Sequence, residues 1–77
     1  MLSYFQKRIL EQYIENEITS HGSGIDTRLL ILHVVTVTNG NDIPANKHHL
    51  AGLLGYVANK YSHTWIIKQP GGQSIIS

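Results

Sequence analysis

The chain has 77 residues, enough for one domain with one small core. Hydrophobic residues make up 42% of it and charged residues only 14%, a balance that argues against intrinsic disorder. The absence of cysteine excludes disulfides, thiol nucleophiles and thiolate metal sites. Because a secreted domain this small usually needs disulfides, we expect a cytoplasmic protein. The longest nearly apolar run, residues 29–37, is too short to span a membrane, and the charged N-terminal segment is not a signal peptide.

The first segment is predicted to be an amphipathic helix over residues 4–18. Ser3 and Gln6 fit a capping box, in which each side chain satisfies the other residue's backbone amide. Apolar side chains then recur at helical spacing: Phe5, Ile9 and Tyr13, and Leu10, Ile14 and Ile18. The other face is predicted to be solvated and carries Lys7, Arg8, Glu11, Glu15 and Asn16. Glu15 and Glu17 oppose the helix dipole, so this end is expected to fray.

The second segment leaves two interpretations open. Residues 19–24 are a loop by composition, and Asp26 can cap a helix over residues 27–38. The apolar side chains of this segment point in all directions, which predicts a buried element. The β-branched run 34–38 favours a strand, whereas the length and the cap favour a helix, which we choose. Asn39-Gly40 predicts a left-handed stop.

The third segment is predicted to be a helix over residues 45–61, with Pro44 suited to its first turn. It carries one apolar stripe: Leu50, Leu53, Leu54, Val57 and Tyr61. After Ser62 the pattern changes to two short β-forming runs around Pro70-Gly71-Gly72, which predicts a hairpin over residues 64–76. Trp65 is expected to pack into the core at the base of this hairpin.

The expected fold is therefore mainly α with a small β-hairpin, in one domain over residues 1–77. The order of helix, helix, helix and hairpin resembles that of winged-helix DNA-binding domains. The resemblance is one of pattern and covers most of the chain from Ile25 on. It implies that the third helix enters a DNA groove and that the hairpin, or wing, lies against the DNA backbone. The link 39–43 is longer than a tight helix-turn-helix corner and has room for the short first strand that often pairs with a wing.

The charge pattern points to the same half of the chain. All five acidic residues lie in the first 42 positions, and residues 43–77 contain basic residues and histidines but no acid. This asymmetry predicts a negatively charged partner, and we expect it to be double-stranded DNA. The candidate DNA-binding residues are Lys47, His48, His49, Gly52, Tyr56, Asn59, Lys60, Lys68, Gln69 and Gln73.

Gly52 and Gly55 lie in the middle of the third predicted helix, where glycine costs about 1 kcal/mol each relative to alanine. One interpretation is that they let the helix approach DNA or a partner closely. The other is that they let the helix pack tightly inside its own domain.

The expected function is that of a small DNA-binding regulator of transcription or replication. The first helix, through Tyr4, Phe5, Ile9 and Tyr13, is a candidate dimer surface, because paired half-sites follow from two-fold symmetry. The alternative is a protein-interaction module or inhibitor that does not bind DNA, which the net charge of only +1 favours.

The sequence contains no motif that is typical of a catalytic or metal-binding site. Gly71-Gly72-Gln73 matches the tripeptide of release factors, but its strand-like flanks favour a turn. His33 is interpreted as a satisfied core histidine. No two of the five histidines have the i, i+4 spacing of a helical zinc site, so we predict no metal, no cofactor and no enzymatic activity.

Overall fold

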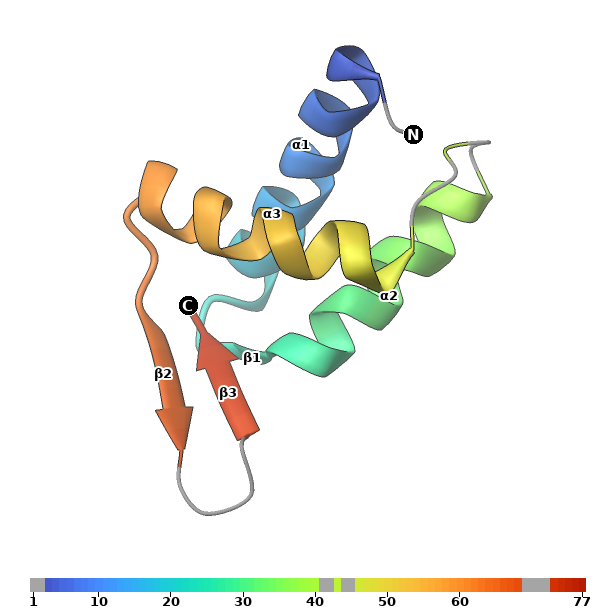
Figure 1. Ribbon diagram of the computed structural model, residues 1–77. Helices are drawn as coiled ribbons and strands as arrows, with labels where there is room; N and C mark the ends of the chain where they lie inside the picture. Colours follow the sequence, from blue (N-terminus) through green and yellow to red (C-terminus); the bar gives the residue numbers. More distant parts are fainter. Residues whose placement is uncertain (1–2, 41–42, 44–45, 69–72) are drawn as a thin grey trace.

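Helices dominate the structure, and a small antiparallel sheet follows them (Figure 1). The computed structural model describes residues 3–40, 43, 46–68 and 73–77. Its elements are α1 (Tyr4–His21), β1 (Ile25–Asp26), α2 (Thr27–Asn39), α3 (Lys47–Lys60), β2 (Trp65–Lys68) and β3 (Gln73–Ile76). In Figure 1, α3 crosses in front of α1, and β2 and β3 project below the helices. The predicted fold class, helices followed by a C-terminal hairpin, is confirmed.

Helix α1 begins as predicted but ends three residues later, at His21. Ser3 and Gln6 form the predicted capping box. The two acids whose charges led us to expect fraying, Glu15 and Glu17, both have partners in the structure. The Glu15 carboxylate contacts His63, and the Glu17 carboxylate contacts His33. Gly22 follows with φ of 62°, a left-handed conformation that favours glycine.

Only one of the two predicted apolar rows of α1 faces the core. Leu10, Ile14 and Ile18 are buried, whereas Phe5 and Ile9 are exposed. Glu11, predicted to be solvated, is instead buried with 8% of its surface exposed. Glu11 follows Leu10 in the sequence and lies beside α3. This contact with α3 cannot be recognised from the sequence of α1 alone.

Segment 27–39 is a helix, so the strand alternative is wrong. The Asp26 carboxylate accepts a hydrogen bond from the Arg28 amide at 2.8 Å, and this bond, helped by the Gln73 side chain, holds the pKa of Asp26 below its ordinary value of 3.8. Buried Thr38 satisfies its hydroxyl by donating to the Val34 carbonyl at 2.8 Å. Gly40 has φ of −68°, so the predicted left-handed stop is wrong. The expectation of burial on all sides is also wrong, since 60% of Leu32 is exposed.

Helix α3 is slightly shorter than the predicted 45–61. Asn46 caps it by accepting hydrogen bonds from the amides of His48 and His49, and Tyr61 closes it. Pro44 lies outside the described residues. The predicted apolar stripe is confirmed: Leu50, Leu54 and Val57 are buried, and Leu53 and Tyr61 pack partly buried against them.

The sheet contains a strand that the sequence did not predict at this place. Its order is β1-β3-β2, with Ile25 of β1 opposite Ile76 and Trp65 of β2 opposite the same residue. The link 39–43 had room for a first strand, but among the described residues of that link none is a strand, and residues 41–42 lie outside them. Two residues are too few for a strand pattern. Ile76 is fully buried and so joins the sheet to the helical core.

Trp65 does not occupy the core as predicted. It is 38% exposed, and its ring lies near Gly55 of α3. Fully buried Ile76 fills the core position at the base of the hairpin instead. None of the described helices is long and apolar enough to cross a membrane.

Candidate nucleic-acid interface

The outward side of α3 brings together four of the ten predicted DNA-binding residues. We define the α3 face as His48, Gly52, Gly55, Tyr56 and Asn59, all exposed. These positions follow the spacing of successive helix turns, so they form one stripe opposite buried Leu50, Leu54 and Val57. The residues of the α3 face point outward because burial of the apolar stripe fixes the rotation of α3 about its axis. The predicted residues His48, Gly52, Tyr56 and Asn59 are thus presented together.

The two glycines of the α3 face are not explained by packing inside the domain. A Cβ atom at Gly52 would meet no atom within 4 Å. One at Gly55 would meet only the Trp65 ring, at an ordinary contact distance of 3.8 Å. The interpretation that these glycines permit tight internal packing is therefore wrong. Packing inside the domain therefore does not account for the helix-weakening effect of these two glycines.

The N-terminal end of α3 carries an unusual cation. Lys47 is exposed and occupies the first helical position, where the positive end of the helix dipole disfavours a positive charge. Within the described residues, Lys47 has no ion pair to offset this cost. His49 is engaged locally: its Nδ1 atom accepts a hydrogen bond from the Asn46 amide at 3.4 Å. Lys47 and His48 are thus available to an anion at this end of α3, where the Asn46 side chain already caps the amides of His48 and His49.

Two predicted DNA-binding residues, Lys60 and Gln73, are exposed but also make contacts within the domain. The Lys60 ammonium lies 3.3 Å from the Glu11 carboxylate, and a hydrogen bond with this carboxylate raises the pKa of Lys60. The Gln73 amide donates to Asp26 at 3.2 Å. Gln73 is therefore the first residue of β3, and its side chain contacts Asp26, the N-cap of α2. Gly71 and Gly72 lie outside the described residues. The side chain of Lys68 and all of Gln69 also lie outside them.

A pocket between α1 and α3 extends the α3 face. It has a volume of about 240 Å³ and is lined by Tyr4, Lys7, Arg8, Glu11, Leu53, Tyr56 and Lys60. Arg8 stacks over the Tyr4 ring at 6.0 Å, and a hydrogen bond with the Tyr4 side chain raises its pKa. Lys60 lies over the Tyr56 ring at 5.6 Å. Because its three cations outnumber its one acid, the pocket is suited to an anion.

Lys7 and Arg8 were not among the predicted binding residues. Their only signal in the sequence is that the first turns of α1 contain cations and no acid before Glu11. Three of the four predicted dimer residues are exposed on the same helix: Tyr4, Phe5 and Ile9. The fourth, Tyr13, packs partly buried against the core, so it is a core residue more than a surface residue.

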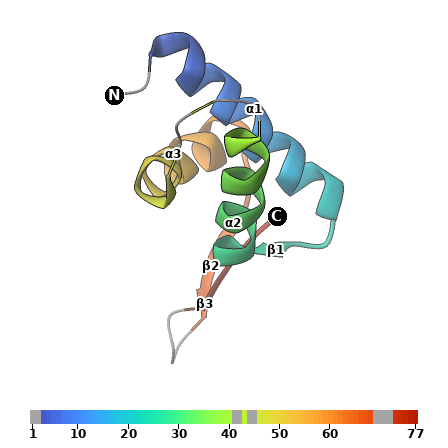
Figure 2. The same cartoon turned by 90° about the vertical axis from the view of Figure 1, so that its right-hand side faces the viewer.

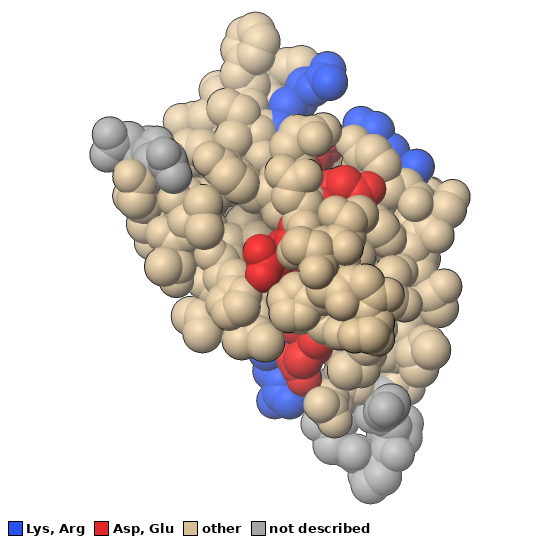
Figure 3. Space-filling model, turned by 180° about the vertical axis from the view of Figure 1, so that it is seen from behind, with Lys and Arg blue, Asp and Glu red and all other residues tan. Residues whose placement is uncertain are grey.

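The acidic residues of α1 tie the helix to the rest of the domain. Glu11 pairs with Lys60 of α3, and Glu15 contacts His63 beyond α3. The Glu15 and His63 side chains are only 15% and 11% exposed. Figure 3, seen from behind, shows acidic side chains in the middle of that face. In Figure 2, α3 lies on the opposite side from the C-terminal half of α1. Glu11, however, lines the pocket that extends the α3 face.

No protein-family model, no curated protein and no solved structure matches this chain.

Proposed function

We propose that this protein binds double-stranded DNA through the α3 face and the β2–β3 hairpin, and that it acts by binding and not by catalysis. In this proposal the chain is a winged-helix-like regulator of transcription or replication in the cytoplasm. The observation that carries the proposal is the pair of exposed glycines, Gly52 and Gly55, with open space or ordinary contact in front of them. Because these two residues have no side chains, another molecule can approach the backbone of α3 closely there, next to exposed polar side chains.

The dimensions of α3 support a major-groove contact. The α3 face extends from His48 to Asn59, which is about 16 Å along a helix. The major groove is about 12 Å wide and admits an α-helix. Asn59 can contact an adenine edge through its amide, and His48 carries ring nitrogens suited to bases or phosphates.

The order of elements also supports the proposal. A short strand, β1, pairs with β3 of the C-terminal hairpin, as a wing often pairs with a first strand. The hairpin projects beyond the helices, where a wing would meet the DNA backbone (Figure 1). In this arrangement Lys47 contacts a phosphate at one end of α3, and Lys7 and Arg8 contact another from the α1–α3 pocket.

The exposed aromatic end of α1 supports a homodimer on two half-sites. Tyr4 and Phe5 are 69% and 76% exposed, and their rings contact each other edge to face. Burying them in a second copy would remove a large apolar surface from water. Sedimentation velocity over a range of concentrations should show a dimer that the variant Phe5→Ser weakens. A monomer at all concentrations would remove this part of the proposal.

The alternative is a protein-interaction module, which the exposed apolar side chains of the edge strand β2 favour. Ile66 is 55% exposed and Ile67 is 62% exposed. A mainly apolar protein interface depends little on salt, whereas contacts with phosphates weaken steeply as salt rises. The salt dependence of binding therefore separates the two functions.

Lys47→Gln tests the proposed phosphate contact at α3. Removing one phosphate contact should weaken binding to duplex DNA about eightfold at about 0.1 M salt and should reduce the slope of log K against log salt by about 0.9. Asn16→Glu is the matched control, because it also lowers the net charge by one and lies exposed on the outer side of α1. Equal losses in the two variants would show a general charge effect and would contradict the contact at Lys47.

A further inference from the structure

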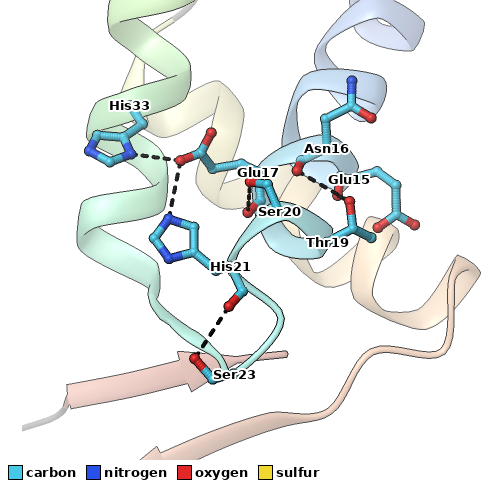
Figure 4. Close-up of polar contacts among 8 residues, drawn as sticks. All are labelled: Glu15, Asn16, Glu17, Thr19, Ser20, His21, Ser23 and His33. Atoms are coloured by element: carbon cyan, nitrogen blue, oxygen red, sulfur yellow. Dashed lines mark hydrogen bonds and ion pairs between the residues drawn. The ribbon is translucent and has the colours of Figure 1, made fainter.

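A second site lies where the end of α1 meets α2 (Figure 4). Three potential metal ligands meet there: Glu17 and His21 from the last turn of α1, and His33 from α2. The His33 Nδ1 atom lies 2.6 Å from Oε1 of Glu17, and the His21 Nε2 atom lies 3.5 Å from the same oxygen. Figure 4 shows both rings directed at this one carboxylate oxygen.

The spacing of these atoms is close to that of a metal site. Ligand atoms of a tetrahedral zinc site are about 3.3–3.5 Å apart, given metal–ligand bonds of about 2.0–2.2 Å. The three ligand atoms lie within 4.8 Å of one another, so side-chain adjustments of about 1.5 Å or less would place them around one ion. Glu17 and His21 have the i, i+4 spacing that lets two ligands on one helix share an ion.

The surroundings also favour a cation. His21 is in the last turn of α1, where the helix dipole is negative. Two imidazoles and one carboxylate form a donor set that suits zinc and neighbouring transition metals, whereas magnesium requires more oxygen ligands. The side chains of Glu17, His21 and His33 are 24%, 35% and 43% exposed, so an ion can reach them from solvent.

We propose that Glu17, His21 and His33 form a binding site for a divalent transition-metal ion of the zinc type. In the bound state the ring nitrogens that face Glu17 hold the ion without protons, because metal ligation requires deprotonated ligand atoms. With three protein ligands, it leaves at least one position for water. Bound there, it clamps the end of α1 to α2. This site does not depend on the proposed DNA function.

The prediction that the chain has no metal site rested on the distances between histidines along the sequence. That search omitted the Glu17–His21 pair, and His33 is brought to it only by the packing of α1 on α2. The interpretation of His33 as a satisfied histidine is correct with respect to its Glu17 partner, but this side chain is partly exposed.

Calorimetric titration of the full chain, free of any affinity tag and treated with chelator, tests the site with ZnCl₂ as the probe. We expect one ion per chain and no binding of Mg²⁺. His33→Asn and Glu17→Gln should each weaken zinc binding about tenfold or more. The double variant His48→Asn, His49→Asn is the control and should bind zinc as the wild type does. Loss of binding in this control alone would overturn the proposal.

Because Glu17 and His33 also contribute to the contact between α1 and α2, a second measurement avoids variants. In wild-type protein, the ring signals of His21 and His33 in NMR spectra should shift at the first equivalent of zinc. Those of His48, His49 and His63 should remain in place. Shifts confined to His48 and His49, or no saturable shift at all, would contradict the site.

Discussion

Gly52→Leu is expected to stabilise the domain while weakening its binding to duplex DNA. A Cβ atom at this position meets no neighbour within 4 Å, so the larger side chain fits without moving the fold. Replacing a mid-helix glycine by leucine should raise the free energy of unfolding by about 0.5–1 kcal/mol. The same side chain would hold the α3 face away from the groove and should weaken binding about tenfold, or about 1.4 kcal/mol. Urea denaturation and fluorescence anisotropy give the two values.

Ala51→Leu is the matched control for this change. Ala51 is exposed and is the neighbour of Gly52 in the sequence, but it points to the side of the α3 face, about 100° away. It adds comparable bulk to the same helix and should leave DNA affinity within about twofold of the wild type. A Gly52→Leu protein that is folded and binds DNA like the wild type would show that the α3 face is not the interface.

Ile76→Ala is expected to have the largest effect on stability. Ile76 is fully buried and lies between Ile25 of β1 and Trp65 of β2, so it joins both outer strands to the core. Removing a buried isoleucine side chain to Cβ costs about 2–5 kcal/mol. A domain of 77 residues has only about 4–12 kcal/mol in total. We therefore expect a large shift of the urea midpoint and a partly unfolded population at low denaturant.

Ile67→Ala provides the comparison, because the same residue type in the same sheet is 62% exposed there. It should change the free energy of unfolding by no more than about 0.5 kcal/mol. If both variants had similar small effects, the sheet would not be anchored through Ile76, and the position assigned to the hairpin would be wrong.

Local patterns predicted the helices well. The capping box at Ser3, the cap at Asp26 and the apolar stripe from Leu50 to Tyr61 depend on residues within a few positions of one another. For this reason all three helices start within two residues of the predicted positions. The hairpin was likewise predicted from its turn residues and the β-forming runs beside them.

Contacts between distant parts of the chain could not be predicted in this way. Glu11 was expected in solvent, yet it pairs with Lys60, which is 49 positions away. Through the same ion pair, Lys60 links α3 to α1. β1 exists only because β3 pairs with it, and the cluster of Glu17, His21 and His33 exists only because α1 packs on α2. The open space in front of Gly52 could likewise be recognised only in the structure, since the sequence was equally consistent with tight packing inside the domain.

The most direct test of the central claim is the binding of mixed-sequence duplex DNA by wild-type protein, measured by fluorescence anisotropy from about 0.05 to about 0.3 M salt. We predict binding that weakens steeply as salt rises. Absence of binding at the lowest salt would contradict a DNA interface at α3 and favour the protein-interaction function.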